Sequence, residues 1–262
     1  MFGVVPKSIW NKLNPADENN MCTWAMRCLL LEYGDKLILI DTGIGNKQSL
    51  DFFKHFYLDQ QDSLFNSIQS VGFSPNDITD VFLTHLHFDH CGGAVQLDDA
   101  NHPVLAFPKA NYWTNSKHLY NAQHPNPREK PSFRPDNIQP IVDSGKLKFT
   151  DQHPHYFEPY FDILHVDGHT EQQMLPIIPY HGTHLVYAAD LIPSVGHIAV
   201  PYIMAYDMQP LKAMKEKEVL LEKSLEGNYT LFFEHDPIVE CATLHKTEKG
   251  IRVKDTLLLS EI

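Results

Sequence analysis

Residues 81–93 read VFLTHLHFDHCGG, and this stretch decides the fold. Its first four residues predict a short buried strand. Three imidazoles and a carboxylate follow within six residues, and His85 and His87 point the same way if the strand continues. The paired glycines behind them let the backbone turn tightly into a helix. Because imidazole nitrogen and carboxylate oxygen bind a cation such as zinc, the stretch predicts a metal-binding loop rather than a surface histidine cluster.

Strands and helices alternate on both sides of this loop, which is typical of a layered α/β fold. A helix is predicted over residues 49–71, where Phe52, Phe53 and Phe56 fall on one face. A second helix is predicted over residues 210–225, whose interleaved lysines and glutamates indicate a solvated face rather than a phosphate-binding patch. Strands are predicted at 23–32, 36–40, 81–84, 161–166, 174–178, 184–189 and 230–233.

Residues 100–160 are the least regular part of the sequence and hold many of its 18 prolines. They also hold Tyr112, Trp113, Tyr120 and Phe133, large aromatic side chains that favour burial over disorder. We therefore expect an ordered insert of loops and short helices, not a linker. The 262 residues fit a single domain that carries this insert at about 100–160.

The chain has a formal net charge of -12, which argues against a nucleic-acid partner because phosphates attract a basic surface. Its four cysteines form no CxxC pair, so free thiols in a reducing compartment are favoured over a disulfide between Cys22 and Cys28. Residues 1–10 lack the basic start and the apolar run of a signal peptide. No stretch approaches the roughly 18 apolar residues of a membrane helix. We expect a soluble, cytoplasmic protein with no membrane partner.

The pattern H-x-H-x-D-H-x-G-G at residues 85–93 resembles the signature of the metallo-β-lactamase superfamily. Further elements of that family occur in the same order between about residues 20 and 240. They are the loop Asp41-Thr42-Gly43, the element Gly168-His169-Thr170, the strand end Ala189-Asp190 and the strand end Phe233-Glu234-His235-Asp236. The resemblance implies an α/β fold built as a four-layer αββα sandwich, with the activity of a dinuclear metal-dependent hydrolase.

The resemblance also implies the ligands of two divalent metal ions, with zinc as the default and manganese, iron or cobalt as ions that fit the same donors. The implied ligands are His85, His87 and His169 at one ion, Asp89, His90 and His235 at the other, and Asp190 as the bridge. A hydroxide shared by the two ions would be the nucleophile, because water bound to such ions ionises near neutral pH.

Other residues near the motif receive roles from the same resemblance. Asp89 is expected to carry a proton from the shared water to the leaving group. Asp41 and Thr84 are expected to orient ligand histidines, and the alternative for Asp41 is to cap its own loop. Cys91 is predicted to be a packed thiol rather than a ligand.

The stretches after Asp190 and around His235 are most similar to quorum-quenching N-acyl homoserine lactonases of this family, which open a lactone ring. Those lactonases carry a tyrosine three residues after the bridging aspartate, where this chain has Pro193. Tyr206 is then the candidate catalytic residue at the carbonyl oxygen, or it packs with its hydroxyl tied off. His197 either lines the pocket or has a structural role.

Several alternatives stand beside the lactonase. A phosphotriesterase or aryl esterase would use the same metals, whereas a glyoxalase-type thioesterase is disfavoured because no basic C-terminal extension is evident. A non-hydrolytic metal-binding protein is disfavoured because structural zinc sites are closed and cysteine-rich. His87 argues against a redox diiron protein, since that branch of the family has glutamate there.

The expected partner is a small-molecule substrate with an apolar tail. Its tail would enter a mouth formed by the aromatic residues of 112–133 and by the helix that starts at Ser49. The insert and that same helix are also the candidate surfaces for a homodimer.

Overall fold

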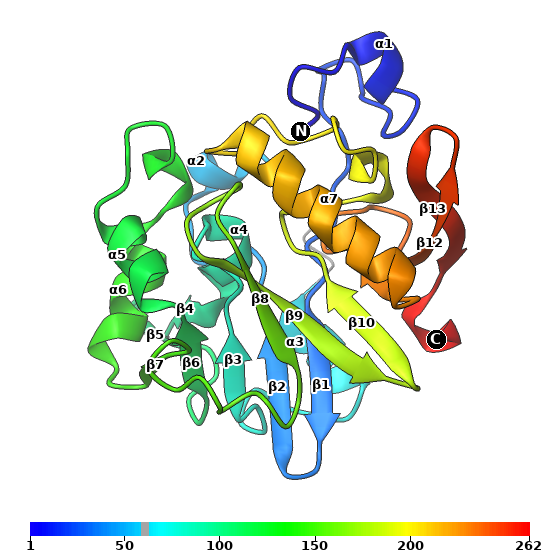
Figure 1. Cartoon of the computed structure of the whole chain (residues 1–262). Coiled ribbons are helices and arrows are strands. Elements are labelled where there is room, and N and C mark those ends of the chain that lie inside the picture. Colours follow the sequence, from blue (N-terminus) through cyan, green and yellow to red (C-terminus); the bar gives the residue numbers. More distant parts are fainter. Residues whose placement is uncertain (59–62) are drawn as a thin grey trace. The chain divides into compact units, whose positions relative to one another are not determined.

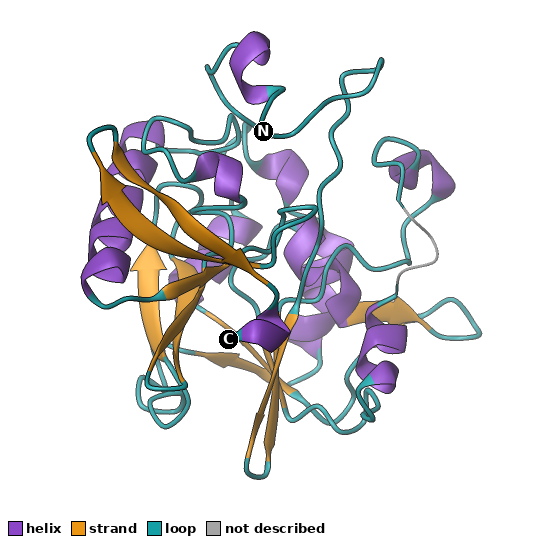
Figure 2. Cartoon of the chain, turned by 90° about the vertical axis from the view of Figure 1, so that its right-hand side faces the viewer, coloured by secondary structure: helices purple, strands orange, loops and turns teal. Residues whose placement is uncertain are grey.

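The computed structural model describes residues 1–58 and 63–262, and the chain divides into two compact units (Figure 1, Figure 2). One unit consists of Met1–Arg27 and His155–Ile262, and the other of Cys28–Pro154. Each unit is built on its own mixed sheet. That the two units form a single domain over 1–262 stays a prediction.

The Cys28–Pro154 unit is built on a five-stranded sheet of order β1-β2-β3-β6-β7. β1 and β2 form an antiparallel hairpin, whereas β3, β6 and β7 add to β2 in parallel. The strands are β1 (Leu29–Tyr33), β2 (Lys36–Ile40), β3 (Asp80–Phe82), β6 (Asn111–Thr114) and β7 (Leu147–Phe149), and a separate pair consists of β4 (Val95–Leu97) and β5 (Pro103–Leu105). The strand predicted at 36–40 is confirmed as β2, and the one at 81–84 is β3, which ends two residues earlier.

The helices of this unit are short. They are α2 (Leu50–Phe53), α3 (Leu64–Ser70), α4 (Phe88–Cys91), α5 (Ser116–Gln123) and α6 (Pro135–Asp143), with 3-10 turns η1 (Gly92–Ala94) and η2 (Lys130–Ser132). The prediction of one continuous helix over 49–71 is wrong, because α2 ends after one turn and Tyr57 takes φ 49°, outside the right-handed helical region. Ser63 then caps α3 as a new helix start. Residues 59–62 of the predicted helix lie outside the described residues.

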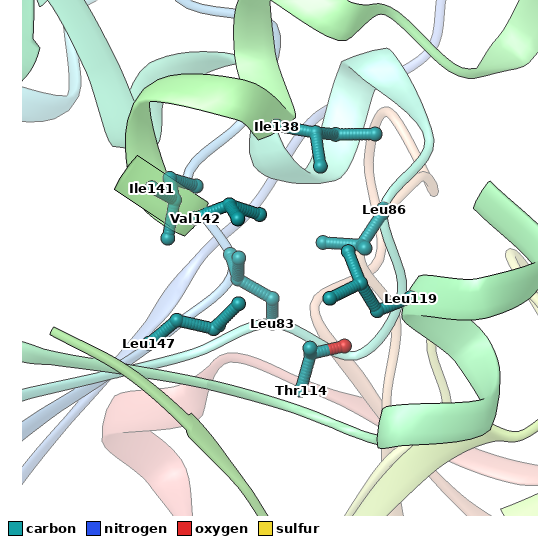
Figure 3. Close-up of a pocket in the computed structure, with 8 residues that line it drawn as sticks. All are labelled: Leu83, Leu86, Thr114, Leu119, Ile138, Ile141, Val142 and Leu147. Carbon is teal, nitrogen blue, oxygen red and sulfur yellow. The ribbon is translucent and has the colours of Figure 1, made fainter. Parts of the chain in front are cut away.

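The apolar core of this unit gathers side chains from β2, β3, β6, α3, α5 and α6, and Figure 3 shows residues around one small cavity in it. Tyr112 and Phe133 of the predicted insert are 0% and 6% exposed, so its order is confirmed, although Tyr120 is 65% exposed. The segment was predicted as loops and short helices, but it also forms β5, β6 and β7, and the last two belong to the five-stranded sheet. The packing leaves a cavity of about 10 Å³, at the lower limit for one water molecule. Its walls are Leu83, Leu86, Thr114, Leu119, Ile138, Ile141, Val142 and Leu147. Side chains therefore fill this interior and leave no room there for a ligand.

The other unit is built on a six-stranded sheet of order β13-β12-β11-β10-β9-β8. β10 and β11 are parallel, and the remaining neighbours are antiparallel. The strands are β8 (Asp162–Val166), β9 (Gln173–Tyr180), β10 (Thr183–Tyr187), β11 (Thr230–Phe232), β12 (Cys241–Thr247) and β13 (Gly250–Leu257). The predicted strands at 161–166, 174–178, 184–189 and 230–233 are confirmed, whereas β12 and β13 were not predicted.

The strand predicted at 23–32 is only partly right, because β1 begins at Leu29. Ala25 and Arg27 instead donate their amides to the carbonyl oxygens of His235 and Glu234, at 3.1 and 2.9 Å. The N-terminal part of the predicted strand therefore supports the segment that carries a predicted ligand.

The α-helices of this unit are α1 (Lys7–Trp10) and α7 (Pro210–Glu226). Its 3-10 turns are η3 (Val195–His197) and η4 (Leu259–Glu261). The helix predicted at 210–225 is confirmed as α7, the long golden helix of Figure 1. Its buried positions include Leu220, Leu221 and, less expectedly, Lys217. None of the described helices combines the length and the apolar character needed to cross a membrane.

Candidate metal centre

The histidine loop (residues 84–93) follows β3 and turns into α4. His85 and His87 are buried, and Nε2 of His85 lies 3.0 Å from Nδ1 of His87. His87 is the N-cap of α4, so Asp89 and His90 lie on its single turn. Nε2 of His90 is 3.9 Å from a carboxylate oxygen of Asp89, whose side chain is 31% exposed. The loop therefore gathers four of the predicted ligands within six residues.

Asp41, directly after β2, holds the histidine loop in place. Its Oδ1 accepts the amide of Thr84 at 2.8 Å. Its Oδ2 accepts the hydroxyl of Thr84 at 2.6 Å and Nδ1 of His90 at 3.1 Å. Asp41 is fully buried, so these charge-assisted hydrogen bonds are stronger than they would be in water. The carboxylate thus orients His90 and does more than cap its own loop.

Gly92 and Gly93 allow two backbones to touch. A Cβ atom on Gly93 would lie 2.2 Å from the carbonyl oxygen of Thr42, and one on Gly92 would lie 2.2 Å from that of Ile44. Across this contact the amide of Thr42 donates to the carbonyl oxygen of His90 at 2.7 Å. The glycines are therefore required for close approach between the loop after β2 and the histidine loop.

Hydrogen bonds fix which nitrogen of His85 and His87 carries the proton. The hydroxyl of Thr84 donates to Asp41, so its oxygen accepts from Nδ1 of His85 at 3.1 Å. Oε1 of Glu129 accepts from Nε2 of His87 at 3.2 Å. The remaining nitrogens, His85 Nε2 and His87 Nδ1, each keep a lone pair. Two lone pairs 3.0 Å apart repel each other unless a proton or a cation stands between them.

The other unit brings three predicted ligands to the ends of its strands. His169 follows β8, Asp190 follows β10 and His235 follows β11. Oδ2 of Asp190 lies 3.0 Å from Nε2 of His169, and Oδ1 lies 2.9 Å from Nε2 of His235. Each oxygen of this one carboxylate therefore faces a different imidazole, which suits a group that bridges two cations.

The second nitrogens of these two rings are also engaged. Nδ1 of His169 donates to Oδ1 of Asp207 at 3.0 Å, and Nδ1 of His235 donates to the carbonyl oxygen of Ala25 at 2.7 Å. Burial disfavours the charged form of His169, yet Asp190 and Asp207 on either side raise its pKa to about 10. The two carboxylates therefore favour a positive charge at this ring, which a divalent cation would supply as a proton does.

The loop that follows Asp190 is held by Lys217 of α7, which is fully buried. Its Nζ donates to three carbonyl oxygens of that loop, at 2.7 to 3.1 Å, those of His197, Ala199 and Tyr202. An ammonium group has three protons to donate, so this geometry satisfies it completely. These three hydrogen bonds hold the loop in place, and the same loop carries Asp207.

His197 has the contacts of a structural residue. Its ring is buried and stacks on Phe2 with centroids 4.3 Å apart, and its Nδ1 lies 2.8 Å from the hydroxyl of Ser194. Burial, assisted by the charge of Lys217, lowers its pKa to about 3, so the ring is neutral near pH 7. These contacts favour the structural alternative over a place in the pocket lining.

The four cysteines are free thiols, with Cys91 and Cys241 buried and Cys22 and Cys28 half-buried. Sγ of Cys91 donates to the carbonyl oxygen of Leu86 at 3.3 Å. Burial raises the pKa of this thiol to about 12, so it is protonated and packed, as predicted.

Tyr206 is 56% exposed in the loop before α7, so it is not packed in the core. Its catalytic role stays a prediction.

The sequence did not predict three groups that accept hydrogen bonds from the rings of His87, His169 and His235. They are Glu129, Asp207 and the carbonyl of Ala25. Glu129 lies 42 residues from His87, and Asp207 lies 38 residues from His169. No fixed spacing marks such partners in a sequence. The one available signal was for Asp207, which follows Tyr206 in a stretch already singled out.

The chain thus forms two mixed sheets, and imidazole and carboxylate donors lie in buried clusters near the ends of strands. The sequence profile described as Metallo-beta-lactamase superfamily matches residues 27–235. The chain belongs to this superfamily and has its fold, α/β with two mixed sheets, as the resemblance implied.

Solved structures and curated sequences resemble the chain to different extents. A probable metal-dependent hydrolase from Staphylococcus aureus has a TM-score of 0.84 and 27% identity, covering 98% of this chain and 90% of that one. AidC, a dizinc quorum-quenching lactonase in complex with a product, has a TM-score of 0.71 and 25% identity, covering 90% and 81%.

Two curated relatives match over shorter lengths. A probable metallo-hydrolase of Mycobacterium tuberculosis is 34% identical over 86 residues, which is 30% of this chain and 28% of the relative. An N-acyl homoserine lactonase of Bacillus sp is 26% identical over 175 residues, which is 62% and 60%. The chain thus spans between about a quarter and three fifths of these relatives.

Proposed function

We propose that the chain is a dinuclear metal-dependent hydrolase that opens lactone or ester bonds. Its proposed ligands are His85, His87, Asp89, His90, His169, Asp190 and His235. The observation that carries the proposal is the hydrogen bonding of the five histidines: each has one nitrogen fixed by a partner within its own unit. Metal-ligating histidines almost always donate their other ring N–H to a carboxylate, a backbone carbonyl or water, and these five histidines also lie beside carboxylates in buried clusters of donors.

The donors fit divalent cations. Borderline cations such as zinc accept imidazole nitrogen and carboxylate oxygen, and manganese, iron and cobalt fit the same set. Nε2 of His85 and Nδ1 of His87 face each other, and the oxygens of Asp190 each face one imidazole. When bound, a pair of divalent cations makes water acidic near neutral pH and polarises a carbonyl or phosphoryl oxygen.

Asp89 is proposed as the proton carrier of this reaction. Its side chain is 31% exposed, whereas the neighbouring proposed ligand His90 is fully buried. A carboxylate with a free oxygen near solvent can accept a proton and later deliver it to a leaving alcohol. Asp89 therefore combines a ligand position with access to the substrate.

An apolar tail is the proposed recognition element of the substrate. Phe88, between His87 and Asp89 in the chain, has its ring 5.5 Å from that of Phe52 and 5.3 Å from that of Phe56. These rings are half-buried or exposed, and the guanidinium of Arg134 lies 4.7 Å above the ring of Phe52. An accessible aromatic surface beside the histidine loop suits an acyl chain.

Three aromatic residues of the insert do not contribute to this mouth. Tyr112, Trp113 and Phe133 are buried in the core, so their rings are occupied by protein contacts, whereas Tyr120 is 65% exposed. We therefore propose α2 and Phe88 as the main part of the mouth, while a contribution of Tyr120 and the homodimer surface stay predictions.

The lactone is favoured over other esters by the relatives. Several of the curated relatives are named N-acyl homoserine lactonases, and AidC is in complex with a product, N-hexanoyl-L-homoserine. Pro193 favours the alternative of an aryl esterase or phosphotriesterase, because it provides no hydroxyl where lactonases carry a tyrosine. Its carbonyl oxygen accepts the amide of His235 at 3.1 Å, so its place in the fold is structural.

The test is the ring opening of a short and a long N-acyl homoserine lactone, followed by pH-stat with zinc-loaded protein. We expect turnover by the wild type, its loss in Asp89→Asn, and no change in Asp99→Asn, which removes an exposed carboxylate of the same unit. A faster reaction with the long chain would support the aromatic mouth. Activity restricted to aryl esters or phosphotriesters, again lost in Asp89→Asn, would support the proposal of a metal-dependent hydrolase and reject a lactone as its substrate.

A further inference from the structure

The segment of residues 116–133, which contains α5 and η2, contacts the histidine loop at three points. Nε2 of His118 accepts the amide of Leu86 at 2.8 Å. Phe133 forms a β-bridge with His87, and the two rings lie 4.9 Å apart. Glu129 provides the third contact, the hydrogen bond from Nε2 of His87. A part of the insert that was predicted to line the substrate mouth thus holds His87, a proposed metal ligand.

Glu129 is oriented by its own surroundings before any cation binds. Its Oε2 accepts the side-chain amides of Asn121 and Asn126, each at 3.2 Å. The amide of Glu129 donates in turn to Oδ1 of Asn126 at 3.1 Å. The residue is 2% exposed, so this carboxylate is a buried anion with one oxygen held by amides and the other directed at His87.

The bond to Glu129 selects the metal-binding nitrogen of His87. A carboxylate can only accept, so Nε2 of His87 carries a proton, and in the neutral ring Nδ1 is the nitrogen that keeps the lone pair. Without Glu129 the ring could turn over or change tautomer, and Nδ1 would no longer be held opposite Nε2 of His85. The buried negative charge also makes the imidazole a stronger donor to a cation.

We propose that Glu129 is a positioning residue that sets the affinity for the cation bound by His85 and His87. The inference rests on the proposed function only in that the site holds metal. The other four histidines among the proposed ligands hydrogen-bond with Thr84, Asp41, Asp207 and the carbonyl of Ala25, all outside the 116–133 segment. Loss of Glu129 should therefore act on one of two binding steps.

The experiment is a zinc titration of metal-free protein against a chromophoric chelator, without any lactone. In Glu129→Gln we expect one of the two binding steps to weaken by roughly 10–100-fold and the other to stay within about twofold. The matched control is Glu158→Gln, which breaks an exposed pair, His155 Nδ1 to Glu158 Oε1 at 2.7 Å, and should change neither step. Nitrogen NMR of the metal-free proteins should show the Nε2–H tautomer of His87 in the wild type and a mixture in Glu129→Gln.

A folding defect is separated from positioning by a second variant. Asn126→Ala leaves the carboxylate in place but removes one of the amides that orient it, and should weaken the same step by a smaller factor. If both variants fold, by circular dichroism, and keep both zinc steps and the wild-type tautomer, Glu129 is only an anchor of the segment and the inference is overturned. An equal weakening of both steps would also overturn it.

The outcomes also separate this inference from the proposed function. Two zinc steps in the wild type without lactone hydrolysis would reject the lactone and leave the Glu129 result decisive. A wild type that binds no zinc would overturn both.

Discussion

Oδ1 of Asp207 lies 3.0 Å from Nδ1 of His169, with both side chains buried. The opposite nitrogen of the same ring lies 3.0 Å from Oδ2 of Asp190. The imidazole is therefore held between two carboxylates, which orients it and raises its pKa to about 10 against the effect of burial. A divalent cation that binds Nε2 gains from the same negative charge and must displace the proton.

Asp207→Asn should reduce zinc affinity, because an amide still contacts His169 but no longer brings a negative charge. We expect one zinc-binding step to weaken by roughly 10–100-fold, measured by chelator competition. Asp255→Asn is the control, since that carboxylate is 54% exposed and contacts Thr243. Equal affinities in both variants would show that Asp207 has no influence on a cation.

Local patterns predicted what lies close together in the chain. The apolar run before His85, the imidazoles and the paired glycines all sit within residues 81–93, so their arrangement on one strand end and one helical turn could be anticipated. Partners of those rings could not, because Glu129 and Ala25 come from distant positions and use contacts that follow only from the packed tertiary structure.

Helix ends were the second weakness of the sequence prediction. The aromatic run after Ser49 has helical spacing, but propensity alone does not show that Tyr57 adopts a positive φ and that Ser63 starts a new helix. The mouth was the third, since Tyr112 and Phe133, which were expected to help form it, fill the core, whereas Tyr120, which was expected to be buried, is 65% exposed. The exposed rings at α2 and Phe88 carry that role in the proposal.

Gly93→Ala should separate the histidine loop from the loop after β2. The added Cβ would meet the carbonyl oxygen of Thr42 at 2.2 Å, so the backbones must move apart and the hydrogen bond from Thr42 to His90 is strained. We expect a loss of about 1–3 kcal/mol in the free energy of unfolding, measured by urea denaturation, together with weaker zinc binding.

Gly182→Ala is the comparison for that clash. Gly182 has φ 81° with open space around it, so the variant carries backbone strain of about 1 kcal/mol without a steric contact and should keep wild-type zinc affinity. Unchanged zinc affinity in Gly93→Ala would mean that the close approach does not shape the histidine loop.

Lys217→Met should destabilise the protein, although it removes a buried charge. The methionine fills a similar volume but leaves the carbonyl oxygens of His197, Ala199 and Tyr202 without their donor. Buried acceptors without donors cost about 1–3 kcal/mol each, partly offset by the lost desolvation of the ammonium, so we expect about 2–4 kcal/mol in total by denaturant unfolding. Lys215→Met is the control, because Lys215 is exposed and its ammonium lies 2.8 Å from the carboxylate of Glu218 on the same helix. A loss of unfolding free energy no larger than that of the control would contradict this stabilising role of Lys217.

His197 should make the protein sensitive to acid, because its ring is neutral and buried in the folded chain. Burial, with the nearby charge of Lys217, lowers its pKa to about 3, whereas an exposed histidine in the unfolded chain titrates near 6.5. Between these values the unfolded state binds more protons than the folded state, so the contribution of His197 to stability is complete above about pH 6.5 and falls as the pH drops toward 3.

The variant His197→Phe tests this pH dependence. In the wild type the ring of His197 stacks on Phe2 with centroids 4.3 Å apart, and a phenylalanine keeps a ring at this place but has no group that titrates. Urea unfolding at pH 7 and pH 5 should therefore show a smaller acid loss in His197→Phe than in the wild type, while His245→Phe, at an exposed position of β12, should lose as much as the wild type. The same acid loss in all three proteins would assign the sensitivity to other groups and leave His197 without this role.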